Sequence, residues 1–142
     1  MNDRPILIEN NALADFFVGE EGFKMAAENL RRKLPNWITS PLCRYEFGNV
    51  LRTYVRRGFV SEVDSRLLLR QGLQMVSFCS ECSDEAILAE ANASGLAFYN
   101  ATYAASARAL GCPFYTRDGD ILKKCPEIEF GPKGSWALLL IE

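Results

Sequence analysis

The stretch of sequence that decides the fold is SGLAFYNATYAASARALGCPFYTRD, residues 94–118. Its alanine-rich part, Tyr99–Leu110, predicts a helix, and the apolar run Pro113–Thr116 predicts a strand. Asp118 follows this strand at its carboxyl end. A helix, a strand and then an acidic residue in close succession indicate an α/β protein whose functional residues lie at the carboxyl edge of a parallel sheet.

The same alternation continues through the rest of the chain, with no repeat or low-complexity linker. Four more strands are predicted at Pro5–Ile8, Asn36–Thr39, Met75–Phe78 and Ile128–Phe130. Helices are predicted at Ala12–Val18, Phe23–Leu34, Ser40–Arg57, Ser61–Gly72, Ser83–Ala93 and Gly119–Lys124. This order predicts one domain, residues 1–142, in which helices cover both faces of a parallel sheet.

Local signals set the bounds of the two central helices. Ser40 and Pro41 are favoured at a helix start, and Gly58 is the usual residue after a helix end. Ser61 and Asp64 have the spacing of a capping box. In the ordinary structural explanation of Glu9, this residue enters a turn and Asn10 or Asn11 caps the first helix.

Composition limits the chemistry. The 142 residues include no His, which excludes Ser-His and Cys-His nucleophile systems. The net charge of −2 provides no global basic field, so contact with RNA would have to be local, at Arg31–Lys33, at Arg52 with Arg56 and Arg57, or at Lys123–Lys124. Each of these clusters is also typical of a solvated helix face.

The five cysteines are expected to be reduced, and Cys79 and Cys82 form a CxxC motif. A zinc site would need further Cys or His ligands, and a thioredoxin-type pair would need the motif at the start of a helix after an early strand. We therefore expect both cysteines to be small residues packed where a strand gives way to a helix. With no membrane-length apolar segment and no export signal, we expect a cytoplasmic protein.

Four polar residues are expected to meet in one crevice: Glu9, Glu46, Asn100 and Asp118. Each follows a predicted strand or lies in the first turns of a helix. Three of them are carboxylates, and such a group is costly to hold together without a cation, for which a hard divalent metal is the usual partner. Each residue also has an ordinary structural explanation, as a turn residue or a helix cap, so only the combination indicates a site.

The chain resembles the PIN-domain family, and within it the toxin ribonucleases of the VapC type, over about residues 5–130. The resemblance rests on ILIENNAL at 6–13, SPLCRYEFGNVLRTYVRRG at 40–58, residues 94–118 and Ile121–Leu122. Glu46 and the triplet Thr116-Arg117-Asp118 match the family pattern. Glu9 and Asn100 depart from it, because the family usually has Asp at both positions.

The resemblance implies a three-layer α/β/α sandwich with five parallel strands in the order 3-2-1-4-5. It also implies an endoribonuclease that uses Mg²⁺ or Mn²⁺, with Glu9, Glu46, Asn100 and Asp118 as catalytic residues. Glu9, Glu46 and Asp118 would bind the metal, and Asp120 is a candidate substitute ligand. Asn100 lowers the formal charge of the site from −4 to −3, whether it arose naturally or was introduced to silence a toxin.

Two functions follow from these departures. The first is a metal-dependent toxin ribonuclease, weakened at Asn100, that acts on RNA and pairs with an antitoxin protein. The alternative is a catalytically impaired module that binds RNA or a protein.

The apolar tail at residues 135–142, which includes Trp136–Ile141, is expected to pack on the domain or across a homodimer. A receiver domain and a glycine-rich nucleotide site both lack their required residues.

Overall fold

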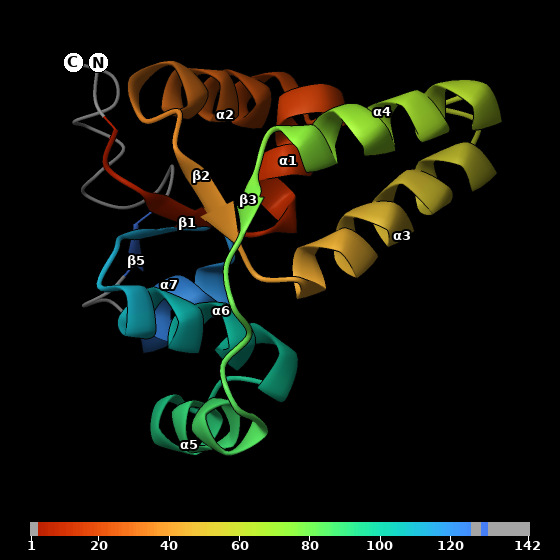
Figure 1. Ribbon diagram of the computed structural model, residues 1–142. Helices are drawn as coiled ribbons and strands as arrows, with labels where there is room; N and C mark the ends of the chain where they lie inside the picture. Colours follow the sequence, from red (N-terminus) through yellow and green to blue (C-terminus); the bar gives the residue numbers. More distant parts are fainter. Residues whose placement is uncertain (1–2, 126–128, 131–142) are drawn as a thin grey trace.

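The computed structural model describes residues 3–125 and 129–130, and it arranges them as a parallel sheet with helices on both sides (Figure 1). The strands are β1 (Ile6–Ile8), β2 (Trp37–Thr39), β3 (Ser77–Phe78), β4 (Phe114–Tyr115) and β5 (Glu129–Phe130). The helices are α1 (Asn10–Val18), α2 (Glu21–Lys33), α3 (Leu42–Arg56), α4 (Glu62–Gln74), α5 (Asp84–Ser94), α6 (Phe98–Leu110) and α7 (Gly119–Lys124). The apolar tail predicted at residues 135–142 lies outside the described residues.

The order of the strands across the sheet is β3-β2-β1-β4, which confirms the predicted α/β class and the order 3-2-1-4. All pairs are parallel, and Leu7 in β1 lies between Ile38 in β2 and Phe114 in β4. The three residues of β1 are fully buried, as expected for a strand that is covered on both faces. At the β4 edge, where a fifth strand was predicted, the backbone of Glu129 is paired with Phe114.

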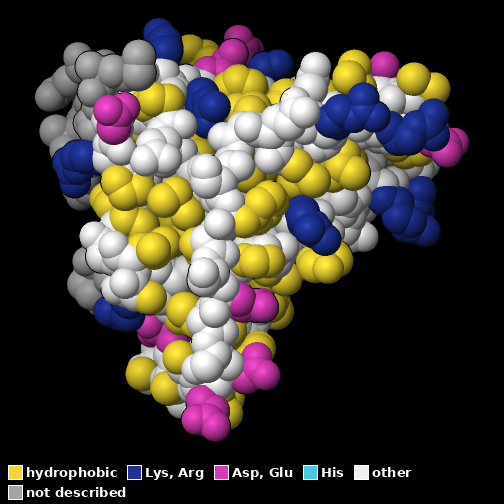
Figure 2. Space-filling model, viewed as in Figure 1, with side chains coloured by type: hydrophobic (Ala, Val, Ile, Leu, Met, Phe, Trp, Pro, Cys, Tyr) yellow, Lys and Arg dark blue, Asp and Glu magenta, His cyan; other side chains and the backbone are white. Residues whose placement is uncertain are grey.

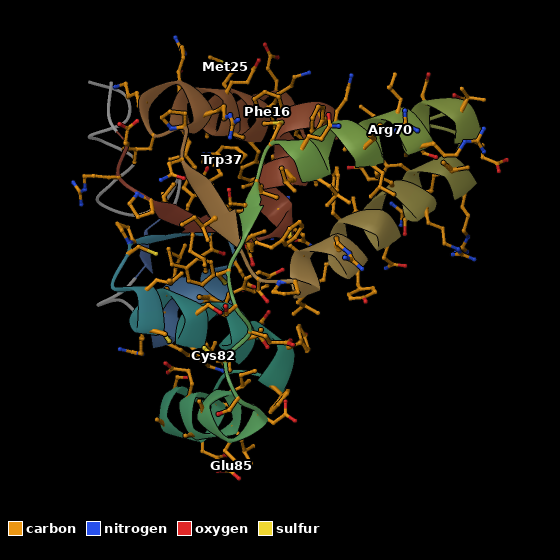
Figure 3. The ribbon with its side chains drawn as sticks, in the orientation of Figure 1. Phe16, Met25, Trp37, Arg70, Cys82 and Glu85 are labelled. Atoms are coloured by element: carbon orange, nitrogen blue, oxygen red, sulfur yellow. The ribbon has the colours of Figure 1, made fainter. Side chains whose placement is uncertain are left out.

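Helices α1 and α2 cover one face of the sheet, and α6 and α7 cover the other (Figure 1). Phe16 of α1 packs edge-on against Trp37 of β2, with ring centroids 6.2 Å apart (Figure 3). On the opposite face, Tyr103 of α6 stacks on Phe114 of β4. These aromatic contacts hold the helix layers against the sheet, which fixes the positions of the loops at its carboxyl edge.

Helices α3 and α4 form a hairpin that projects from the sheet, and we call residues 42–74 the arm (Figure 1). Its turn contains Gly58 at φ +77°, a conformation that favours glycine. The Ser61 hydroxyl accepts from the Asp64 N–H at 3.0 Å, as the predicted cap requires. At its base, a Cβ atom added to Gly72 would lie 2.4 Å from the Phe47 ring, so glycine allows α3 and α4 to approach closely there.

Some predicted bounds need correction. The first helix begins at Asn10, and Glu9, not Asn10 or Asn11, occupies its N-cap position. The fourth helix continues past Gly72 to Gln74 because the backbone keeps its helical hydrogen bonds, and the third strand is therefore shorter than predicted. The Ser40 hydroxyl does accept from the N–H of Leu42, at 3.2 Å.

The five cysteines are free thiols, and Cys79 and Cys82 are half-buried in the segment between β3 and α5. Within residues 3–125 and 129–130, no three Cys, Asp or Glu side chains are grouped so that they could hold a metal ion. No helix in the described part of the chain is long and apolar enough to cross a membrane.

Candidate active site

Three carboxylates from separate segments lie close enough to influence one another at the carboxyl edge of the sheet. Glu9 follows β1, Glu46 lies in the second turn of α3, and Asp118 follows β4. The negative charges of Asp118 and Glu46 both raise the pKa of Glu9, although burial is the larger cause. The crevice that was expected from the sequence therefore has three of its four polar residues within electrostatic range.

Glu9 is the most constrained of the three, because only 4% of its surface is exposed. Its Oε1 atom accepts hydrogen bonds from Asn11 Nδ2, at 3.0 Å, and from the Thr116 hydroxyl. Burial raises the pKa of Glu9 to about 7, even though these two hydrogen bonds favour the charged form. Asn11, a candidate cap of α1 in the ordinary explanation of Glu9, instead holds this carboxylate in place.

The position of Glu46 is fixed by a contact with α6, which covers the opposite face of the sheet from α1 and α2. It is half-buried, and its Oε1 atom accepts a hydrogen bond from the hydroxyl of Tyr103 in α6. Burial raises the pKa of Glu46, and the hydrogen bond from Tyr103 acts in the other direction. Because the rest of Tyr103 is fully buried, the position of Glu46 depends on how α6 packs on the sheet.

Asp118 is the N-cap residue of α7. Its Oδ1 atom accepts from the backbone N–H of Asp120 at 2.9 Å and of Ile121 at 3.5 Å. Its own N–H donates to Thr116 Oγ1 at 3.0 Å, and that hydroxyl donates in turn to Glu9. Asp118 therefore has the capping role that we named as its ordinary explanation, and the same hydrogen bonds connect it to Glu9.

Asn100 and Asp120 occupy less constrained positions. Asn100 lies half-exposed in the first turn of α6, three residues before Tyr103 and on the same side of that helix. The Asp120 carboxylate is 3.1 Å from Lys124 Nζ, and its side chain is 52% exposed. A role for Asp120 as a substitute ligand stays a prediction, and it would require release from Lys124.

Two further features were not found from the sequence. Tyr103 reaches Glu46, and its place one helical turn after Asn100 was the available signal. Arg117 donates from Nε to Asp15 Oδ2 at 2.6 Å and from Nη2 to Oδ1 at 3.1 Å, and its guanidinium lies 4.3 Å from the centre of the Phe23 ring. This paired contact fastens the segment before Asp118 to α1, and no periodicity in the sequence indicated it.

The donor atoms of the crevice suit a hard cation. Carboxylate and amide oxygens are the ligands that Mg²⁺ and Mn²⁺ prefer. Burial is the main cause of the raised pKa of Glu9, and the negative charges of Asp118 and Glu46 add to it. The carboxylates are not, however, grouped closely enough to form a ready-made three-ligand cluster among the described residues. A cation would therefore have to draw them together.

Comparisons with known proteins give the family from the sequence and the fold from solved structures. A sequence model described as PIN domain matches residues 6–126. A search of curated proteins by sequence finds no significant match. PAE2754 from Pyrobaculum aerophilum is a similar solved structure, with 22% identity, a TM-score of 0.75, and coverage of 97% of this chain and 93% of that one.

Two further structures belong to toxin-antitoxin systems. A toxin-antitoxin complex from Klebsiella pneumoniae has 20% identity and a TM-score of 0.64, and the match covers 91% of this chain and 98% of that one. VapBC2 from Rickettsia felis, bound to a DNA fragment from its promoter, has 11% identity and a TM-score of 0.62, over 89% and 98% of the two chains. At these identities the likeness shows a shared fold.

Proposed function

This chain belongs to the PIN domain family, and from that premise we propose that it is a metal-dependent endoribonuclease of the toxin type. The observation that carries the proposal is that Glu9, Glu46 and Asp118 come from three segments to the same edge of the sheet, where Thr116 connects Asp118 to Glu9 and the charges of Asp118 and Glu46 act on Glu9. The structural likeness to two toxin-antitoxin proteins supports the toxin type.

Each carboxylate has a defined task in this proposal. Glu9, Glu46 and Asp118 would hold Mg²⁺ or Mn²⁺, and Asn100 would offer one amide oxygen at the rim. When bound, the cation lowers the pKa of a water molecule and neutralises charge that develops on the phosphodiester. Thr116 and Tyr103 fix the orientations of Glu9 and Glu46 by donating to their Oε1 atoms, so that their Oε2 atoms are the ones free of these contacts.

The same proposal includes partners. A toxin ribonuclease needs an inhibitor inside its own cell, and the toxin-antitoxin neighbours support an antitoxin protein in that role. Because the predicted apolar tail at residues 135–142 would be costly to leave in water, we include a homodimer. Light scattering of the full chain and of a variant that ends at residue 134 tests this part: equal masses and equal melting temperatures would count against it.

Binding of metal is the first test. Calorimetric titration with Mn²⁺ should give weak binding to the parent protein and none to Asp118→Asn, in which the α7 cap is retained because Asn caps as well as Asp does. Excess Mn²⁺ should also raise the melting temperature of the parent, since a ligand that binds only the folded state stabilises it. Equal heats for the two proteins would remove Asp118 from the site.

Restoring the missing carboxylate is the second test. Asn100→Asp adds one negative charge where the family usually has Asp, so it should tighten Mn²⁺ binding and raise cleavage of a mixed-sequence RNA. Adding Glu9→Asp shortens the side chain to the usual length. If the double variant cleaves no faster than Asp118→Asn in the same background, the crevice is not a weakened nuclease site.

Two observations favour a second candidate function. Asn100 lowers the charge of the crevice, and the described carboxylates are not grouped as a metal cluster. A module that binds RNA or protein without cleaving would fit both facts. It predicts binding of RNA that is unchanged by EDTA, together with no cleavage by the parent or by Asn100→Asp.

A further inference from the structure

A cavity of about 450 Å³ lies between the turn that joins α1 to α2 and the end of α3 in the arm. Gly19 and Glu20 line it on one side, and Tyr54, Arg57 and Phe59 line it on the other. Its volume lies within the usual range of small-molecule sites, which is about 300–1,000 Å³. The mechanism proposed for the carboxylate crevice does not use any of these residues.

The lining of the cavity combines aromatic faces with charges that are not paired. Phe59 is 71% exposed, and its ring packs edge-on with Tyr54 at a centroid separation of 5.9 Å. Arg57 and Glu20 carry opposite charges and line the same cavity, yet neither forms an ion pair with another residue in the described ranges. Both charged groups are therefore available to a ligand, next to the solvent-exposed ring of Phe59.

The cavity and the carboxylate crevice are connected along α3. Arg57 comes eleven residues after Glu46, which places it on nearly the same side of the helix at about 100° per residue. Tyr54 lies eight residues, or about 12 Å along the axis, from Glu46. A stacked single strand of about three to four nucleotides spans this distance at roughly 3.4 Å each.

The charge of the arm suits a polyanion. Residues 42–74 contain six arginines and three acidic residues, in a chain whose net charge is −2. Figure 2 shows Lys and Arg side chains over the outer part of the arm, whereas Asp and Glu gather near α5. The arm is therefore the part of the chain in which a local basic surface coincides with exposed aromatic rings.

The two other basic clusters named from the sequence are partly used inside the fold. Arg31 donates to the carbonyl oxygens of Pro35, at 3.0 Å, and Met75, at 2.7 Å, and its guanidinium lies over the Trp37 ring. Lys124 contacts Asp120 and donates to the carbonyl oxygen of Gly95. These contacts favour the arm, with Arg57, as the surface for RNA.

We propose that this cavity binds one unstacked base of the RNA strand, about three to four nucleotides from the carboxylate crevice, and that it prefers guanine. Phe59 and Tyr54 provide the stacking surface, and Arg57 binds the adjacent phosphate. Glu20 accepts from the base edge, where guanine presents two neighbouring N–H donors. This inference rests on the proposed function, because it assumes that RNA is the substrate.

The first test measures binding in the absence of cleavage. Fluorescence anisotropy with a labelled 12-nucleotide mixed-sequence RNA in EDTA should show that Phe59→Ala weakens binding by about 5- to 150-fold, the range that follows from the loss of one base-stacking contact. Phe78→Ala is the matched control, since Phe78 is an exposed ring on β3, and it should bind as the parent does.

Arg57 is tested by salt dependence, which a merely structural role would not change. Arg57→Ala should lower the slope of log K against log salt by about 0.7, the value for one phosphate contact with a single strand. Phe59→Ala should leave that slope unchanged. Arg32→Ala, at an exposed arginine of α2 outside the arm, is the control and should keep the parent's slope. Equal affinities and slopes for the Phe59, Arg57 and control variants would overturn the proposal.

The choice of base is tested with mononucleotides. GMP should compete with the labelled RNA more strongly than UMP, and Glu20→Gln should reduce that difference. Equal competition by GMP and UMP would overturn the role assigned to Glu20. Displacement of the RNA by an apolar peptide but by no nucleotide would assign the cavity to a protein partner instead.

Failure of this inference and failure of the proposed function give different results. RNA that is bound through Phe59 and Arg57 but not cleaved in Mn²⁺ would contradict the nuclease and leave the base site in place. Cleavage in Mn²⁺ at the parent's rate by Phe59→Ala, with unchanged binding, would contradict the base site and leave the nuclease.

Discussion

The carboxylate crevice and the arm share helix α3, yet they treat charged side chains in opposite ways. In the crevice, Glu46 accepts from a buried tyrosine and Glu9 is 4% exposed, so their charges are costly and their positions are fixed. In the arm, Arg57 is exposed and forms no ion pair with a described residue. The difference teaches that one helix can carry a constrained carboxylate near its start and an exposed charged surface at its end.

The largest expected effect concerns the partly buried ion pair between Arg117 and Asp15, beside the crevice. In Arg117→Ala, the Asp15 side chain, which is only 5% exposed, loses its partner, so the free energy of unfolding should fall by about 3 kcal/mol, the lower end of the range for breaking a buried pair, because Arg117 itself is 32% exposed. Arg66→Ala in the arm removes an exposed pair with Glu62 and should cost about 0.3–0.5 kcal/mol. Urea denaturation measures both.

The same pair provides its own control. Adding Asp15→Ala to Arg117→Ala removes the stranded charge, so the double variant should recover part of the lost stability. If Arg117→Ala and Arg66→Ala lower the free energy of unfolding by equal amounts, the contrast between a constrained crevice and an adaptable arm is wrong.

The pH dependence of stability sharpens the contrast further. Glu9 has a pKa of about 7 in the folded protein and about 4.5 when unfolded, so the folded state binds more protons between these values. Stability should therefore fall as pH rises from 4.5 to 7, by about 3 kcal/mol from this group. Glu9→Gln should remove that part of the slope, as denaturation at pH 5 and pH 8 without divalent cations would show. A variant with the parent's full slope would exclude Glu9 as its source.

Two glycines in the arm test how its packing changes along its length. Gly72→Ala places a Cβ atom 2.4 Å from the Phe47 ring, and it should cost about 1–3 kcal/mol. Gly48→Ala meets no atom within 4 Å, and it should stabilise α3 by about 0.5–1 kcal/mol. Thermal unfolding distinguishes the two signs, and destabilisation by both would mean that the arm is tightly packed throughout.

Periodicity and caps were sufficient to predict the helices and the first four strands because these signals are local. Ser61 and Gly58, for example, act within a few residues of their own positions. The site required more. Glu9, Glu46 and Asp118 could be predicted at one edge because parallel strands end together. Apart from the local contact of Asn11 with Glu9, however, the hydrogen bonds to Glu9 and Glu46 come from Thr116 and Tyr103, more than fifty residues away.

The pairing of Arg117 with Asp15 was missed for the same reason. Asp15 lies within an otherwise apolar helix, and nothing in its neighbourhood identifies a partner 102 residues later in the chain. The cavity at the end of α3 depends in the same way on the contact of α3 with the α1–α2 turn. Side chains that meet only through tertiary packing carry no periodic signal in the sequence.

The central claim is that the crevice carboxylates cleave RNA with a divalent cation, and the rate of cleavage by Asp118→Asn tests it most directly. This variant keeps the cap of α7 and loses the charge, so it should fold as stably as the parent. With Mn²⁺ and a mixed-sequence RNA, we expect its rate to be at least about 100-fold lower than the parent's. Equal rates for the two proteins, or cleavage by the parent that continues in EDTA, would contradict the account.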